Sequence, residues 1–230
     1  MYYFADSIGS TVEGDVRLDV AFTDSSLDLQ GLGPEFPRRL AEVEGACGVP
    51  FARLTQVHGA EVQIADGPMA PDAVPTGDAL VTTRRGLGLM VRVADCVPVL
   101  LADPKAGVIG AVHAGRPGMA LGIVTAAVDA MRAQGAGTVR AWVGPHVCGR
   151  CYEVPAEMRD EVAALVPESR SETSWGSPAL DLGAGVEAQL VAAGAEVTRV
   201  DGCTREDARL HSYRRDGAAA GRFAGLVWLT

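Results

Sequence analysis

Short apolar runs rich in β-branched residues recur along this chain, and such runs are typical of β-strands. They predict strands at residues 17–23, 78–83, 87–94, 98–102, 108–113, 138–143 and 223–229. Apolar residues at helical spacing predict helices at 36–47, 119–134 and 186–193, and a fourth that includes 160–165 and begins near Pro155. Because the helices are interspersed with the strands without strict alternation, we expect an α/β fold of mixed β-sheets flanked by helices.

No internal repeat or low-complexity linker divides the 230 residues, so a single domain over 1–230 is predicted. The most turn-rich segment, residues 66–77, is interpreted as a surface loop within that domain. Hydrophobic residues make up 48% of the chain and aromatic residues only 5%, so aliphatic side chains must form most of the core.

Charge and composition exclude several classes of protein. The net charge is -9 and no basic run is present, which argues against a protein that binds the nucleic-acid backbone. No apolar stretch approaches the roughly 18 residues of a membrane span, and residues 1–14 lack the pattern of a signal peptide. Five cysteines without a dense disulfide pattern indicate reduced thiols and a cytoplasmic location.

Three residues suggest a metal site. His58 and His113 each stand beside or near a glycine where an apolar run ends, and Cys96 lies between two apolar runs. Two imidazoles and one thiolate form a three-ligand set for Zn²⁺ that leaves the fourth position open, as in catalytic sites. Read from the residues alone, the histidines could equally be hydrogen-bonded structural residues and the cysteine a small core residue.

A series of motifs surrounds these residues, from about residue 51 to the C-terminus. They are Thr-Gln-Val-His-Gly-Ala-Glu-Val (55–62), Gly-Asp-Ala-Leu-Val-Thr (77–82), Ala-Asp-Cys-Val-Pro-Val-Leu-Leu (94–101), Ala-Val-His-Ala-Gly (111–115), Val-Gly-Pro-His-Val-Cys-Gly-Arg-Cys-Tyr-Glu-Val (143–154), Leu-Asp-Leu (180–182), Cys-Thr (203–204) and His-Ser-Tyr-Arg-Arg-Asp-Gly (211–217). In this order the motifs resemble those of the laccase-domain group, also called multicopper polyphenol oxidoreductases and known largely as purine nucleoside phosphorylases.

The resemblance implies a fold similar to the catalytic domain of the cytotoxic necrotizing factors. It also implies zinc bound by His58, Cys96 and His113. Family members are credited with phosphorolysis of adenosine, inosine, guanosine and methylthioadenosine and with deamination of adenosine, so a nucleoside and phosphate are the expected partners.

Two departures from the family pattern concern the substrate pocket. The usual Trp-Arg-Gly after His-Ala-Gly is replaced by Arg116-Pro117-Gly118. The usual Asn-Leu-Gly and Gly-Asp segments near the N-terminus are also absent, with 27–33 as a poor substitute. Both changes bear on substrate identity more than on metal binding.

Phosphorolysis requires cationic groups for phosphate. The helix predicted to follow residues 114–118 could offer backbone donors to an anion, and Pro117 suits its first turn. Gln56, Arg116 and Arg214 are the predicted substrate contacts, and Arg215 is a further candidate for phosphate. Solvated surface arginines are an equally good interpretation of each one.

Deamination would require a carboxylate that shuttles a proton, and Asp95 and Glu153 are the candidates. Because neighbours in a strand point to opposite faces, Asp95 could aim away from a metal at Cys96. The usual motif of base deaminases is absent. For Asp78, a turn cap is favoured over contact with a ligand.

Other chemistries stay open at the level of sequence. A multicopper oxidase needs far more than four histidines, but a single Cu²⁺ in a polyphenol oxidase would suit two histidines and a cysteine. Cys96 with His113 as base could form a hydrolase, and some family members are proposed to edit peptidoglycan precursors. A binding protein without catalysis is a third alternative. Cys148-Gly-Arg-Cys151 is assigned a structural role, because a zinc ribbon needs a second pair of this kind.

Overall fold

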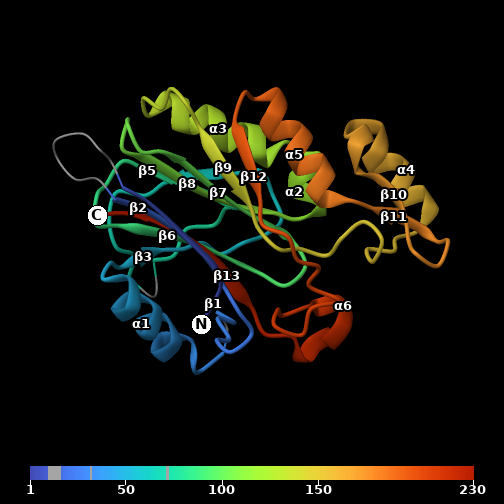
Figure 1. The fold of residues 1–230 in the computed structure, drawn as a ribbon, viewed down its shortest axis with the longest axis horizontal. Helices are drawn as coiled ribbons and strands as arrows, with labels where there is room; N and C mark the ends of the chain where they lie inside the picture. The colour runs from blue at the N-terminus through green and yellow to red at the C-terminus, as the bar shows by residue number, and fades with distance from the viewer. Residues whose placement is uncertain (10–16, 32, 71–72) are drawn as a thin grey trace.

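Two mixed β-sheets packed face to face form the centre of the molecule in the computed structural model, which describes residues 1–9, 17–31, 33–70 and 73–230 (Figure 1). The five-stranded sheet has the order β1 (Tyr2–Gly9), β2 (Arg17–Thr23), β13 (Phe223–Leu229), β6 (Gly88–Val93) and β3 (Phe51–Ala52). The six-stranded sheet has the order β12 (Glu196–Arg199), β9 (Arg140–Val143), β7 (Val97–Asp103), β8 (Val108–Ala114), β5 (Ala79–Thr82) and β4 (Val62–Ile64).

Both sheets are mixed because each combines antiparallel pairs with a parallel pair at one edge or at both edges. Strand β3 pairs with β6 in parallel, and so do β4 with β5 and β12 with β9. The central pairs β7–β8, β5–β8 and β13–β6 are antiparallel. The expected α/β fold of mixed sheets flanked by helices is therefore confirmed.

Helices cover the outer faces of both sheets, so that the fold has four layers (Figure 1). Over the six-stranded sheet lie α2 (Arg116–Ala120), α3 (Ile123–Ala133) and α5 (Leu182–Ala192), and over the five-stranded sheet lies α1 (Phe36–Cys47). The remaining elements are α4 (Ala156–Leu165), the hairpin β10 (Arg170–Glu172) and β11 (Pro178–Leu180), α6 (Tyr213–Asp216) and the 3₁₀ turns Pro167–Ser169 and Gly217–Ala219.

Strand β7 shows how alternation along a strand builds these layers. Val99 and Leu101 pack with the helices, whereas Leu100 and Ala102 pack against the five-stranded sheet. Every residue of β7 is buried, because both faces of the strand are covered. This double burial explains why the strand appears in the sequence as a continuous apolar run.

The long buried elements lie where the sequence predicts them, and the differences have local causes. The predicted strand 17–23 and helix 36–47 have the observed bounds. The helix predicted at 119–134 is wrong as one element: Gly122, with φ 80°, separates α2 from α3. Strands β1, β3, β4, β10, β11 and β12 were not predicted, because they are short or lie half-exposed at sheet edges.

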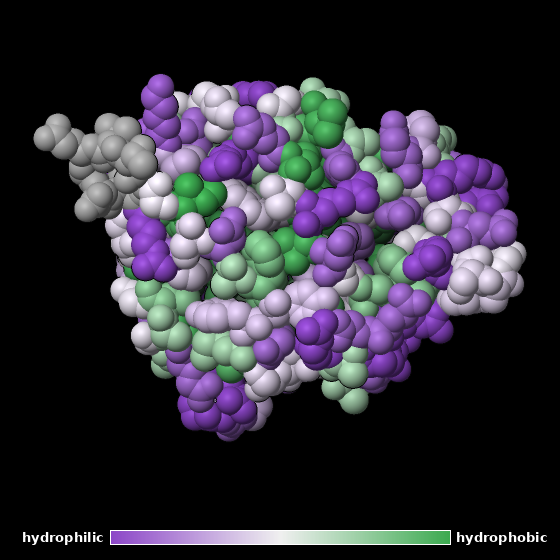
Figure 2. Space-filling view, in the orientation of Figure 1, coloured by the Kyte–Doolittle hydropathy of each residue, from purple (hydrophilic) through white to green (hydrophobic). Residues whose placement is uncertain are grey.

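The surface carries few large groups of hydrophobic residues on the face that Figure 2 shows, as expected when such residues are buried in the cores. On the face shown in Figure 2, hydrophobic residues are interspersed among hydrophilic ones. Within the described residues, no helix combines the length and the apolar character needed to cross a membrane.

Leu100 tests the interface between the sheets. It is fully buried, so Leu100→Ala should lower the free energy of unfolding by about 2–5 kcal/mol through lost burial and a residual cavity. Leu165→Ala is the matched control, because this leucine is 68% exposed and its replacement should change stability by less than about 0.5 kcal/mol. Denaturant unfolding measures both, and equal effects would contradict the assignment of Leu100 to the core.

Candidate metal centre and substrate cavity

The structure brings His58, Cys96 and His113 together at the junction of the two sheets. His58 lies in the loop between β3 and β4, Cys96 in the connection from β6 to β7, and His113 near the end of β8. Their ligand atoms all lie within 4.8 Å of one another. The Sγ atom of Cys96 lies 3.6 Å from Nε2 of His58, and the two imidazole rings are 4.7 Å apart in an edge-on arrangement.

Asp78 organises two members of this trio. Its fully buried carboxylate accepts hydrogen bonds from the backbone N–H groups of Val57, His58 and Gly59, at 2.7 to 3.3 Å. The same carboxylate lies 2.8 Å from Nδ1 of His113. This contact leaves Nε2 of His113 free for a ligand, which is the usual outer-sphere arrangement of a metal-binding histidine.

The electrostatics favour an ionised thiol at Cys96. Burial by itself would raise the pKa of Cys96, but attraction to His113 and hydrogen bonds from both imidazoles lower it to about 6. Burial likewise opposes the charge on His113, yet the Cys96 thiolate and Asp78 raise the pKa of His113 to about 9. Burial would also raise the pKa of Asp78, but hydrogen bonds from His113 and Gly59 hold it below its ordinary value.

A cavity of about 1020 Å³ opens on the trio. Its lining includes all three members of the trio together with aromatic side chains from distant segments, namely Phe36, Tyr152 and Tyr213. The volume lies at the upper end of the usual range for small-molecule sites. A nucleoside and a phosphate ion would fit within it.

Three arginines that were not among the predicted site residues also line this cavity. They are Arg53, Arg92 and Arg222. Desolvation and the charges of Arg53 and Arg222 lower the pKa of Arg92 to about 10, so Arg92 stays protonated at neutral pH. The guanidinium groups of Arg53 and Arg92 lie over the ring of Phe36, at 5.7 and 5.1 Å from its centre.

The guanidinium groups of Arg92 and Arg222 donate to backbone carbonyls and not to carboxylates. Within the described residues, none of the three forms an ion pair with a carboxylate, and the buried Nε atom of Arg92 has no hydrogen-bond partner. Cations gathered beside a cavity in this way form a site for an anion. The signal available in the sequence was Arg92 within the otherwise apolar run Gly-Leu-Met-Val-Arg-Val.

Two predicted residues line the cavity with polar groups that are already bonded within the protein. The side-chain amide of Gln56 donates to the carbonyl of Arg92 and accepts from its N–H group, at 2.8 and 2.9 Å. The carboxylate of Asp95 accepts from the hydroxyls of Thr204 and Ser212 and from the N–H of Arg214, at 2.6 to 2.7 Å. Asp95, which immediately precedes Cys96, thus connects the C-terminal segment to the metal site.

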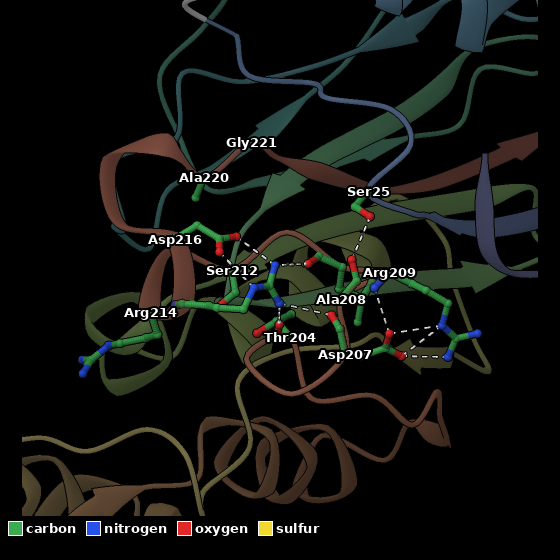
Figure 3. Close-up of polar contacts among 12 residues, drawn as sticks. Ser25, Thr204, Asp207, Ala208, Arg209, Ser212, Arg214, Asp216, Ala220 and Gly221 are labelled. Carbon is green, nitrogen blue, oxygen red and sulfur yellow. Dashed lines mark hydrogen bonds and ion pairs between the residues drawn. The ribbon is translucent and has the colours of Figure 1, made fainter.

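The predicted basic residues have different surroundings. Arg215 donates to the carbonyls of Thr204, Asp207 and Leu210, and it pairs with Asp216. The side chain of Arg214 extends away from this network (Figure 3). The guanidinium of Arg214 donates to the carbonyl of Glu153 and lies over the ring of Tyr152, still at the cavity. Arg215 is therefore engaged in contacts within the protein, and it lies outside the lining of the large cavity.

Arg116 and Glu153 lie outside the lining of the large cavity. Arg116 begins the short helix α2, whose Gly118 packs against the backbone of Gly59. Glu153 lines a second cavity of about 550 Å³, where its carboxylate accepts from Nε1 of Trp175 at 2.7 Å. The structure therefore does not bring these two residues together with the trio.

A second group of possible ligands was also missed. The described residues place Cys148 and Cys151 beside Cys203 and Glu206, with all four ligand atoms within 4.8 Å of one another. A zinc ribbon would have a second Cys-x-x-Cys pair, but the pair that faces Cys148 and Cys151 has the pattern Cys-x-x-Glu. His146 and His211, the other two histidines, belong to neither group.

Curated relatives match most of the chain. It is 57% identical over 180 residues to "Purine nucleoside phosphorylase ORF3" of Streptomyces griseus, and the matched region covers 76% of this chain and 73% of the relative. It is 47% identical over 194 residues to "Purine nucleoside phosphorylase Rv2149c" of Mycobacterium tuberculosis, and the matched region covers 83% of this chain and 77% of that relative.

Solved structures agree with the fold. The Neisseria meningitidis protein NMB0706 superposes with a TM-score of 0.79 at 27% identity, covering 97% of this chain and 98% of that one. YfiH of Bacillus licheniformis gives 0.81 at 25% identity and covers 93% of each chain. The family model described as multi-copper polyphenol oxidoreductase laccase matches residues 36–230, and the chain therefore belongs to that family.

Proposed function

We propose that this protein is a zinc-dependent purine nucleoside phosphorylase. The observation that carries the proposal is that one cavity contains both a three-ligand metal site and a cluster of arginines suited to phosphate. The names of the relatives support an enzyme of this kind. Adenosine, inosine, guanosine and methylthioadenosine are the proposed nucleosides.

The residues of the trio fit a metal ion. Two imidazoles and a thiol whose pKa is about 6 supply three donors, and Asp78 orients one imidazole. A Cβ at Gly115 would lie 2.4 Å from Cδ2 of His58 and 3.3 Å from Sγ of Cys96, so the absence of a side chain there lets these ligands approach. A divalent ion held by this set would act as a Lewis acid toward an oxygen of the bound substrate.

The donor count favours one ion over several. A multicopper centre relies mostly on imidazole ligands, and two of the four histidines are in the trio. Nδ1 of His146 lies 2.8 Å from the carbonyl of Gly144, away from that centre. Copper in the single site stays an alternative to zinc, because both ions accept this ligand set.

The arginine cluster supplies what the phosphate requires. In phosphorolysis a phosphate oxygen bonds to C1′ of the ribose while the bond from C1′ to the purine breaks, and ribose 1-phosphate and the free base are formed. Arg53, Arg92 and Arg222 would hold the phosphate by charge-assisted hydrogen bonds. The aromatic lining, with Phe36, Tyr152 and Tyr213, offers faces for the base and excludes water.

A second candidate function rests on the charge pair of Cys96 and His113. A thiolate beside an imidazolium that a carboxylate orients is also the arrangement of a cysteine hydrolase. Such an enzyme could cleave an amide of a peptidoglycan precursor. A chelator separates the two candidates, because it should abolish a metal-dependent reaction and leave a thiol hydrolase active.

The direct test is an assay of the zinc-loaded protein with adenosine, inosine, guanosine or methylthioadenosine, with and without phosphate. We expect the free base and ribose 1-phosphate, or 5-methylthioribose 1-phosphate from methylthioadenosine, only when phosphate is present. Inosine formed from adenosine without phosphate would add deamination to the activity. No product from any of the four nucleosides would refute the proposal.

Arg53 tests the phosphate site. We expect Arg53→Met to raise KM for phosphate by about tenfold or more, because a charged hydrogen bond contributes about 1.5–3 kcal/mol. The KM for the nucleoside should change little. Arg85→Met is the matched control, since Arg85 is exposed and lies outside the cavity lining, and an equal effect of both substitutions would remove the cluster from the proposal.

Gly115 tests the metal site without changing a ligand. Its backbone angles, φ -77° and ψ 168°, are accessible to alanine, so Gly115→Ala acts only through the added methyl group. We expect the contact with His58 to displace that ligand and to lower zinc content, measured by elemental analysis, together with activity. Gly45→Ala is the control, because a Cβ at Gly45 meets no atom within 4 Å, and unchanged zinc in the Gly115→Ala protein would contradict the geometry.

A further inference from the structure

Two turns of similar form meet beside the smaller cavity. The first runs from Cys148 to Cys151 and the second from Cys203 to Glu206, so each places two potential ligands three residues apart. In the first turn the carbonyl of Cys148 accepts from the N–H groups of Cys151 and Tyr152, at 2.9 and 3.0 Å. In the second turn the carbonyl of Cys203 accepts from Glu206 and Asp207, at 3.1 and 2.9 Å.

The backbone holds these turns against each other. The N–H of His146 donates to the carbonyl of Gly202 at 3.2 Å, and the N–H of Thr204 donates to the carbonyl of His146 at 3.0 Å. The N–H of Cys148 also points to Sγ of Cys203 at 3.5 Å.

The four ligand atoms already have the spacing of a metal site. They lie within 4.8 Å of one another, and tetrahedral Zn²⁺ with bonds of about 2.3 Å to sulfur requires about 3.8 Å between sulfurs. Cys151 is buried, Cys148 and Cys203 are half-buried, and Glu206 is exposed at the surface. Three thiolates with one carboxylate are a donor set that selects zinc over harder ions.

The carboxylate of Glu206 has no basic partner that would compete with a metal ion. Within the described residues no lysine, arginine or histidine forms an ion pair with Glu206. The guanidinium of the neighbouring Arg205 instead lies over the ring of Trp175 and donates to the carbonyl of Cys151.

We propose that Cys148, Cys151, Cys203 and Glu206 bind a structural Zn²⁺ ion in a closed four-ligand site, separate from the trio. Of its four ligands, Cys151 lines the smaller cavity, whereas all three members of the trio line the larger one. Four protein ligands leave no position for substrate, which is the pattern of structural zinc.

The site would act on the catalytic centre through Asp95. The N–H of Val147, next to the first turn, donates to the carbonyl of Asp95 at 3.0 Å. The hydroxyl of Thr204, inside the second turn, donates to the carboxylate of Asp95 at 2.6 Å. A metal that joins the two turns thus fixes two of the contacts of Asp95, the residue immediately before Cys96.

The experiment uses the Cys96→Ser protein, in which the catalytic site lacks its thiolate. The protein is purified with a reductant, its metal is removed, and it is titrated with Co²⁺. We expect visible absorption typical of tetrahedral cobalt–thiolate coordination, saturating at one equivalent and lost on addition of Zn²⁺. Absence of this absorption in the reduced protein, or a disulfide among the three cysteines despite the reductant, would overturn the proposal.

Two further variants in the same background assign the ligands. Cys203→Ser should remove the cobalt–thiolate absorption, whereas Cys47→Ser should retain it because Cys47 lies outside both groups. Glu206→Gln should keep the thiolate signal and weaken Co²⁺ binding by at least about tenfold, the loss seen even for outer-sphere partners. Retained absorption in Cys203→Ser, or unchanged affinity in Glu206→Gln, would exclude that residue and overturn the four-ligand site. The Cys96→Ser measurement stands even if Cys203→Ser fails to fold.

Discussion

The buried carboxylate of Asp78 is the interaction on which the candidate active site depends. It holds three consecutive backbone N–H groups of the 57–59 segment and the imidazole of His113 at the same time. His58 has φ 62°, an unusual value for a residue other than glycine, and these hydrogen bonds stabilise it. Without Asp78, a strained loop and a buried imidazole would both lose their partner.

The packing of the two sheets places this interaction where it can serve chemistry. The connection from β6 to β7 carries the chain from the five-stranded sheet to the six-stranded sheet, and Cys96 lies in it. Its neighbour Asp95 has φ 90° and is held by the C-terminal segment. His58 and Asp95, the two residues of the site with positive φ, are thus both held by hydrogen bonds to a buried carboxylate, that of Asp78 for His58 and its own for Asp95.

The cavity lining combines two kinds of group. The trio supplies donors for a cation, and Arg53, Arg92 and Arg222 supply positive charge. Burial strengthens the effect of these charges, because charges interact more strongly when water is excluded. Gln56 connects the two, since its amide holds the backbone of Arg92 and it lies two residues before His58.

The sequence by itself determined the long buried elements and the members of the trio. Strands such as β7 and β13 are buried on both faces and leave continuous apolar runs, and helix α1 leaves a helical pattern that ends at Gly48. Linked motifs identified the family. Only the tertiary structure decided that Asp78 serves His113, that Arg215 is engaged in contacts within the protein, and that Cys203 and Glu206 face Cys148 and Cys151. These contacts join segments far apart in the chain, and local periodicity contains no information on such distances.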